Sequence, residues 1–260
     1  MDKNHEEKLK SFLDFIKNKN TNLILKGGSA LRFCYNSDRF TEDLDFDGKN
    51  KILIDLIKKY CLNEGFNYFI KKDTDTTQRC TIHYEGQKLP LKIEVSYRKS
   101  NIETKDIKIV NDIQVYDINS LFDQKILALN GRNTLRDLYD ICFIFTSYKK
   151  YISESNINIL RNLLAYKGIE YFDYLVENQK DDNPDLDINQ MADNFLSMYD
   201  ILNLIYNKEE YDIKEKYKND IYKNKNLNKN SVSLETEPII NECPDPEPDP
   251  AEPRNNNRMK

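Results

Sequence analysis

The sequence predicts an α+β protein, in which a mixed β-sheet domain is followed by a helical domain and then by a disordered tail. Before about residue 117, short runs of alternating polar and apolar residues are interleaved with helical patterns, and beyond it only helical patterns follow. The final segment is rich in Asn and Lys and then in Pro, Glu and Asp, so it has too few apolar residues to offset the entropy lost on ordering. We therefore expect domains at residues 1–117 and 118–223 and a disordered acidic tail at residues 224–260.

Helices and strands are expected in turn along the first domain. Gly27 and Gly28 interrupt the first strand, and Ser29 is expected at or near the N-cap of the helix that follows. The expected helices are His5–Lys19, Ser29–Asn36 and Lys51–Asn63. The expected strands are Asn22–Lys26, Asp43–Phe46, Asn67–Lys72, Arg79–Glu85, Leu91–Arg98, Ile107–Val110 and Ile113–Tyr116.

The second domain is expected to be entirely helical, because apolar residues recur there at spacings of three and four. The expected helices are Asn119–Asn130, Leu135–Ser147, Ile157–Ala165, Asn189–Tyr206 and Glu209–Tyr222.

Composition excludes several classes of protein. No apolar run approaches the roughly 20 residues that span a bilayer, and the N-terminus shows no secretion signal, so we expect no membrane contact and a cytoplasmic location. The five cysteines are odd in number and far apart, which argues against both a disulfide framework and a zinc site. Two distant histidines cannot form a His-rich metal centre, whereas a cation bound by oxygen atoms remains compatible with the sequence.

Two carboxylates lie two residues apart in the run DLD. Side chains at positions i and i+2 of a strand point to the same face, so Asp43 and Asp45 are expected side by side, with Leu44 and Phe46 facing the core. Two adjacent carboxylates repel each other unless a cation lies between them. Because Mg²⁺ binds one or two carboxylates together with substrate phosphates, we expect Asp43 and Asp45 to bind Mg²⁺, as one ion or two.

A strand, two glycines and a helix precede these carboxylates in the run KGGSAL. This arrangement lets the backbone approach a phosphate, and the start of the helix and the hydroxyl of Ser29 then offer hydrogen-bond donors. The residues expected to bind the nucleotide are Lys26, Gly27, Gly28 and Ser29. Phosphate donors beside a metal site predict phosphoryl transfer.

A third carboxylate is expected from a neighbouring strand, LKIEVS. Glu94 lies on the face opposite Ile93 and Val95. It could activate an attacking hydroxyl or complete a second metal site. Its alternative interpretation is an exposed strand residue.

These motifs resemble those of the DNA polymerase β-type nucleotidyltransferases, in which GS is followed at a distance by D-x-D. KGGSAL with RFTEDLDF resembles more closely the AbiEii/AbiGii toxin family, with its K-G-G-T-A-L and R-x-S-E-D-L-D-F motifs. LKIEVS resembles that family's strand with the third acid, and LFDQKILALNGRNTLRDLYDICFI resembles its helical segment. The resemblance spans about Leu23–Ile144, in the right order.

The resemblance implies an enzyme that moves an NMP from an NTP to an acceptor hydroxyl. It implies that Lys125 contacts the triphosphate and that Asp137 is a further essential residue, so that the predicted catalytic residues are Asp43, Asp45, Glu94, Lys125 and Asp137. It also implies a toxin of a type IV-like toxin–antitoxin system, with an RNA acceptor such as tRNA and a cognate antitoxin protein as partner. Serine in place of threonine at Ser29 keeps the hydroxyl, whereas Glu94 departs from the aspartate of the wider superfamily.

Several alternatives remain open at this stage. Lys125 could be a solvated lysine, and Arg136, Asp137 and Asp140 could form an ion-pair network that ties the helical half to the sheet. Arg39 could brace Asp43 or the neighbouring Glu42. The chain could also be a small-molecule nucleotidyltransferase of the antibiotic-modifying type, or a binding module with a degenerate site.

Overall fold

The computed structural model describes residues 3–204 except 18, 20, 100, 101, 181, 183 and 184. These residues belong to one compact unit, Met1–Lys214. Its last strand ends at Tyr116 and the following helix begins at Ile118, where the sequence predicts a boundary. The division into two separate domains stays a prediction. The expected helix Glu209–Tyr222 and the expected disordered tail lie outside the described residues.

A mixed sheet of seven strands forms the first half of the described chain and confirms the α+β fold class. The strand order is β3-β4-β5-β2-β1-β7-β6. β2 pairs in parallel with β5 and β1 in parallel with β7, while the other neighbours are antiparallel. The strands are β1 (Ile24–Lys26), β2 (Asp43–Asp47), β3 (Asn67–Thr74), β4 (Thr77–His83), β5 (Leu91–Ser96), β6 (Ile107–Val110) and β7 (Ile113–Tyr116).

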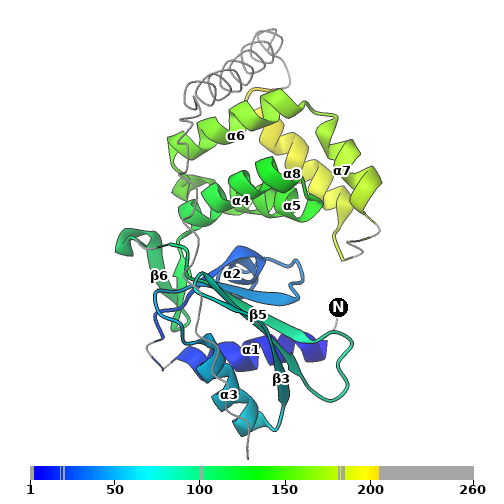
Figure 1. The fold of residues 1–260 in the computed structure, drawn as a ribbon. Helices are drawn as coiled ribbons and strands as arrows, with labels where there is room; N and C mark the ends of the chain where they lie inside the picture. The colour runs from blue at the N-terminus through cyan, green and yellow to red at the C-terminus, as the bar shows by residue number, and fades with distance from the viewer. Residues whose placement is uncertain are drawn as a thin grey trace, which may run out of the picture. The chain divides into compact units, whose positions relative to one another are not determined.

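Helices pack against this sheet and against one another. α3 contacts β3 and β4, and α2 contacts β1, β2, β7 and α4. The later helices gather together, with α5 in contact with α4, α7 and α8 (Figure 1). The helices are α1 (Lys3–Lys17), α2 (Gly27–Cys34), α3 (Leu53–Glu64), α4 (Ile118–Arg132), α5 (Leu135–Tyr148), α6 (Glu154–Lys167), α7 (Tyr171–Gln179) and α8 (Ile188–Ile201).

The start of α2 differs from the prediction. The helix begins directly after β1, at Gly27, so Lys26 is its N-cap and Ser29 lies inside its first turn. Gly27 adopts a φ of 71°, a left-handed conformation that a side chain disfavours. The two glycines therefore do not separate the strand from the helix but form the helix's first two residues.

The helix α7 was not expected from the sequence. Tyr171 and Leu175 are its buried residues, and an apolar pattern of two positions is too short to give a helical periodicity. The other expected strands and helices within the described residues are present, with shifts at their ends.

The two faces of the central strands are as predicted. Leu44, Phe46, Ile93 and Val95 are fully buried in a hydrophobic core that continues into the helical half. Asp43, Asp45 and Glu94 therefore point to the opposite face. None of the described helices is both long and apolar enough to cross a membrane.

The junction between β7 and α4 offers a test of the helix boundary. The Asp117 side chain caps α4 by accepting a hydrogen bond of 2.7 Å from the backbone N–H of Ser120. We expect Asp117→Ala to lower the free energy of unfolding by about 1 kcal/mol, measured by urea titration. The matched control is Asp123→Ala within the same helix, and an equal loss in both variants would contradict the capping role.

Candidate active site

Charged side chains form a continuous row across four neighbouring strands on the face opposite the core. Asp45 of β2 lies opposite Lys26 of β1 and Glu94 of β5, and Glu94 in turn lies opposite Arg79 of β4. Directly paired residues of adjacent strands share a face, so the order along the row is Lys26, Asp45, Glu94, Arg79. The predicted proximity of Asp45 and Glu94 therefore follows from strand pairing.

The carboxylates of this row are crowded. Burial raises the pKa of Asp45, and the negative charges of Asp43 and Glu94 raise it further against the opposing effect of Lys92. Lys92 donates a hydrogen bond to Asp43, and Arg79 donates one to Glu94. The negative charge of Asp45 is thus disfavoured by its surroundings, which is the condition that a bound cation relieves.

The donor set fits a Mg²⁺ site that is completed by substrate. Within the described part of the chain, no group of three or more His, Cys, Asp or Glu side chains is placed to hold a metal ion. Mg²⁺ needs only one or two carboxylates when phosphate oxygens supply the other ligands, so Asp43 and Asp45 suffice. In this structure Lys92 holds Asp43 and Arg79 holds Glu94, and the assignment of Asp43, Asp45 and Glu94 as metal ligands stays a prediction.

Glycine at position 27 keeps the space beside Asp45 open. A Cβ atom at Gly27 would lie 3.6 Å from Oδ2 of Asp45, and the left-handed backbone there already disfavours a side chain. Gly27, Lys26 and Asp45 form one wall of a cavity of about 190 Å³. Typical ligand pockets measure about 300–1,000 Å³, so this cavity matches the phosphate part of a nucleotide rather than the whole.

Helix α4 supplies the other wall of this cavity. Leu121, Lys125, Ala128 and Arg132 are spaced by four, three and four residues and therefore lie on one face of the helix. Gln124 completes the lining. The two basic side chains of this wall face the strand that carries Asp45. Larger cavities of about 340–370 Å³ lie elsewhere, away from the carboxylate pair.

Two of the residues predicted to bind nucleotide make contacts within the protein. The Ser29 side chain is almost fully buried, and its hydroxyl donates a hydrogen bond of 3.1 Å to the carbonyl oxygen of Lys26. The Lys26 ammonium group donates to Asp47, a buried carboxylate that also accepts a hydrogen bond from Tyr116. Asp47 was not predicted, although it continues the alternation of Asp43 and Asp45 along β2.

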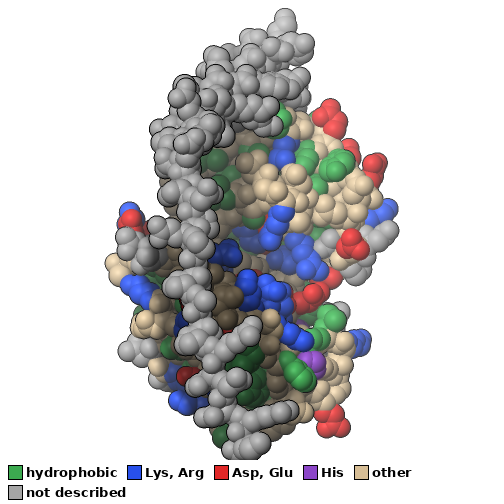
Figure 2. Space-filling view, in the orientation of Figure 1, with side chains coloured by type: hydrophobic (Ala, Val, Ile, Leu, Met, Phe, Trp, Pro, Cys, Tyr) green, Lys and Arg blue, Asp and Glu red, His purple; other side chains and the backbone are tan. Residues whose placement is uncertain are grey.

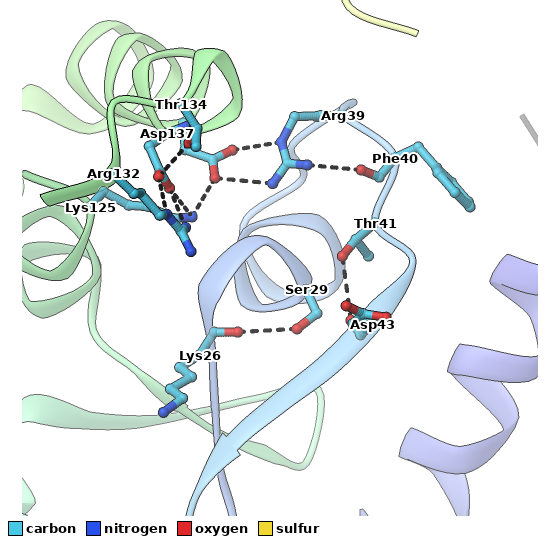
Figure 3. A network of polar contacts seen from close by, with 11 residues as sticks. Lys26, Ser29, Arg39, Phe40, Thr41, Asp43, Lys125, Arg132, Thr134 and Asp137 are labelled. Atoms are coloured by element: carbon cyan, nitrogen blue, oxygen red, sulfur yellow. Dashed lines mark hydrogen bonds and ion pairs between the residues drawn. The ribbon is translucent and has the colours of Figure 1, made fainter. Parts of the chain in front are cut away.

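Lys125 lies at the centre of a buried ion network rather than in solvent. Its ammonium nitrogen is 3.2 Å from Oδ1 of Asp137 and 2.6 Å from Oδ2 of Asp140, and both carboxylates are fully buried (Figure 3). Arg132 binds both oxygens of Asp137 at 2.6 and 2.8 Å, and Thr134 donates a further hydrogen bond. The interpretation of Lys125 as a solvated lysine is therefore wrong.

Arg39 joins the network from the loop before β2. Its Nε and Nη2 atoms donate to the two oxygens of Asp140 at 2.9 and 3.0 Å (Figure 3). The guanidinium group passes over Gly28, where an added Cβ atom would lie 2.2 Å from Nη2. Gly28 therefore has a structural role, besides any contact with phosphate.

The alternative interpretations of these charged residues are confirmed in part. Asp140 does tie the helical half to the sheet half, but through Arg39, whose ion pair is with Asp140 rather than with Asp43 or Glu42 among the described residues. Arg136 lies 3.5 Å from Glu42 and so makes a second link. The sequence did not single out Arg132, although its spacing of seven residues from Lys125 places both on one face of α4.

Two glycines at the start of a helix, a pair of carboxylates on the next strand and basic side chains from a facing helix are the features expected of a nucleotidyltransferase site. A family model described as nucleotidyl transferase AbiEii toxin, type IV TA system, matches residues 15–215. The chain belongs to this AbiEii nucleotidyltransferase toxin family, as the sequence motifs predicted.

Solved structures agree with this fold. The Helicobacter pylori protein JHP933 is 24% identical, with a TM-score of 0.62 over 86% of this chain and 97% of that one. A second H. pylori protein, described as a candidate nucleotidyltransferase, is 25% identical, with a TM-score of 0.62 over 76% of this chain and 93% of that one. No curated protein matches the chain.

The pKa of Asp137 makes stability depend on pH. Burial raises this pKa, but the hydrogen bonds from Arg132 and Thr134 and the charge of Lys125 outweigh burial and lower it to about 2. Since the folded pKa lies below the unfolded one, the ionised carboxylate stabilises the fold above about pH 4 by roughly 2 kcal/mol, and this is lost as the pH falls toward 2.

We therefore expect Asp137→Asn to lose stability at neutral pH and to show a smaller decline in the free energy of unfolding between pH 5 and pH 2. Part of the decline in the free energy of unfolding should remain, because Asp140 is still present and its pKa is also lowered. Urea unfolding at each pH measures this, with Asp123→Asn as the control that keeps the full decline. An unchanged decline in Asp137→Asn would contradict the assignment.

A double-mutant cycle tests the link between Gly28 and Arg39. Gly28→Ala should push Arg39 away from Asp140 and lower the free energy of unfolding by about 2 kcal/mol, because a buried carboxylate loses a partner. In an Arg39→Ala background the same change should cost less than about 0.5 kcal/mol, since the clash is gone. Additive costs would show that Gly28 acts independently of Arg39.

Proposed function

We propose that this nucleotidyltransferase transfers an NMP from a Mg²⁺-bound NTP to a hydroxyl group of RNA and releases pyrophosphate. The acceptor oxygen forms a bond to the α-phosphorus, and the bond from that phosphorus to the β-phosphate oxygen breaks. The family match supports a toxin of a type IV toxin–antitoxin system, so we expect a cognate antitoxin as its protein partner.

The observation that carries this proposal is the pair of unlike walls around the cavity of about 190 Å³. One wall has Asp45 and the backbone at Gly27, and the other has Lys125 and Arg132. A triphosphate complexed with Mg²⁺ offers phosphate oxygens to the basic wall and a cation to the acidic wall. The cavity therefore suits the phosphates of an NTP better than it suits an uncharged ligand.

The charge balance of the helical wall also favours a polyanion. Lys125, Arg132 and Arg39 supply three positive charges against the two carboxylates of Asp137 and Asp140. The Arg132 side chain is 62% exposed, so it can turn toward a phosphate while Lys125 still balances Asp137. The surplus positive charge lies next to the cavity, where it lowers the energy of a bound triphosphate.

Each carboxylate of the sheet wall has a proposed role. Asp43 and Asp45 hold the metal, which neutralises charge on the phosphates and on the leaving oxygen when it is bound. Glu94 lies beside Asp45 on the side away from Lys26 and accepts the proton of the acceptor hydroxyl once it is released from Arg79. Asp137 and Asp140 hold Lys125 in place.

An RNA acceptor is favoured over a small molecule by the distribution of basic side chains on the surface. Figure 2 shows lysine and arginine side chains gathered over the middle of one face of the molecule. The whole chain nevertheless has a net charge of -5. Clustered basic side chains on an acidic protein are the electrostatic footprint of a polyanionic partner.

Transfer of label from the α-phosphate of each of the four NTPs to total RNA tests the proposal. We expect label in RNA with Mg²⁺ and a loss of about a thousandfold in Asp45→Asn, because several kcal/mol of metal stabilisation disappears. Asp123→Asn is the control for loss of one charge. Label in an aminoglycoside or another small molecule, and not in RNA, would contradict the acceptor and support a small-molecule enzyme.

A further inference from the structure

The row of charged residues continues past the carboxylates onto the outer strands of the sheet. Arg79 of β4 lies opposite Lys72 of β3. A second row on the same face begins at Asp43 and runs through Lys92 of β5 and Thr81 of β4 to Phe69 of β3. Both rows lead from the carboxylates to the same edge of the sheet.

The order of residues in these rows fixes the direction from which an acceptor approaches. The cavity proposed for the triphosphate lies on the Lys26 side of Asp45, whereas Glu94 lies on the other side. In phosphoryl transfer the attacking and leaving oxygens are roughly in line across the phosphorus. If pyrophosphate leaves toward Lys26 and Lys125, the attacking hydroxyl comes from the side of Glu94, β4 and β3.

The face of β3 and β4 on that side presents an aromatic side chain. Phe69 is 54% exposed, and the ring of His83 meets it edge to face at 5.0 Å between centroids. The ammonium group of Lys71 lies 5.5 Å from the centroid of Phe69. Because two neighbours restrict the side chain of this exposed phenylalanine, it loses little conformational entropy when a planar group stacks on it.

Basic side chains accompany this ring. Lys72 is partly exposed and the Arg79 side chain is 41% exposed. The neighbouring acid, Asp73, is already paired with Lys51 at 2.8 Å. Cations that alternate with an aromatic ring along a surface are typical of a groove for single-stranded nucleic acid.

This face is also the one that α3 leaves uncovered. α3 is the helix that packs against both β3 and β4. It lies on the core side, where the Gln78 side chain accepts a hydrogen bond from the backbone of Leu53 and where Cys80 is buried. Residues 69, 72, 79 and 83 project from the opposite side.

We propose that the face formed by Phe69, Lys72, Arg79 and His83 binds the single-stranded end of the acceptor RNA and directs its terminal hydroxyl to Glu94. A base stacks on Phe69, and the basic side chains contact the backbone phosphates. This inference rests on the proposed function, because it assumes that nucleotidyl transfer occurs at Asp45. It adds the acceptor site and the chemical class of its occupant.

Direct binding of a labelled single-stranded RNA, followed by fluorescence anisotropy without NTP, tests the surface separately from the chemistry. We expect Phe69→Ala to weaken binding about tenfold and Phe69→Tyr to retain it within about twofold, because tyrosine also stacks. Lys72→Ala should weaken binding and reduce the slope of log affinity against log salt by about 0.7.

The opposite edge of the same sheet supplies matched controls. Ile109 of β6 is 72% exposed, and Lys108 precedes it. Ile109→Ala and Lys108→Ala should leave RNA binding unchanged. Equal effects at the two edges, or no binding of RNA by the unchanged protein, would overturn the proposal. The urea unfolding midpoint of each variant checks that the variant is folded.

Transfer assays on the same variants separate this inference from the proposed function. Phe69→Ala should raise the KM for RNA about tenfold without a matching rise in the KM for NTP. RNA that binds at Phe69 but never receives label would refute the proposed function and leave the binding surface standing. Label that enters RNA with an unchanged KM in Phe69→Ala would refute the surface and leave the function standing.

Discussion

The ion pair between Arg39 and Asp140 is the interaction on which the site depends. Asp140 is fully buried, and it is stable as a carboxylate only because Arg39 and Lys125 both bind it. Arg39 comes from the loop that leads into β2, and Asp140 comes from α5. The pair therefore fixes the helical wall of the cavity to the strand that carries Asp43 and Asp45, and the absence of a side chain at Gly28 leaves room for the Arg39 guanidinium group.

Strand register is the second constraint. Because β2 pairs in parallel with β5, Asp45 and Glu94 lie side by side, and the antiparallel partner β1 places Lys26 on the other flank of Asp45. The result is a polar order across the sheet, with the cavity lined by Lys26 and Lys125 on one side of Asp45 and Glu94 on the other. A shift of one residue would turn every one of these side chains into the core.

Much of the fold follows from local patterns. The seven strands were expected because their patterns are short-ranged. The third helix was expected to end at Asn63, and α3 ends one residue later, at Glu64, before the left-handed Gly65. The start of α2 was placed too late, because glycines usually break a helix, whereas here the left-handed Gly27 is the first residue of α2. α7 was missed because its buried face consists of two residues.

By itself the sequence determined the chemistry offered at the site, because the spacing of Asp43 and Asp45 and the run KGGS are properties of a strand and of a strand-to-helix turn. Tertiary structure decided which partner each charge has. Arg39 and Asp140 are 101 positions apart, and their pairing depends on how the helices pack on the sheet. Burial likewise depends on packing, so a lysine that looks solvated on its own helix, Lys125, becomes the centre of a buried network.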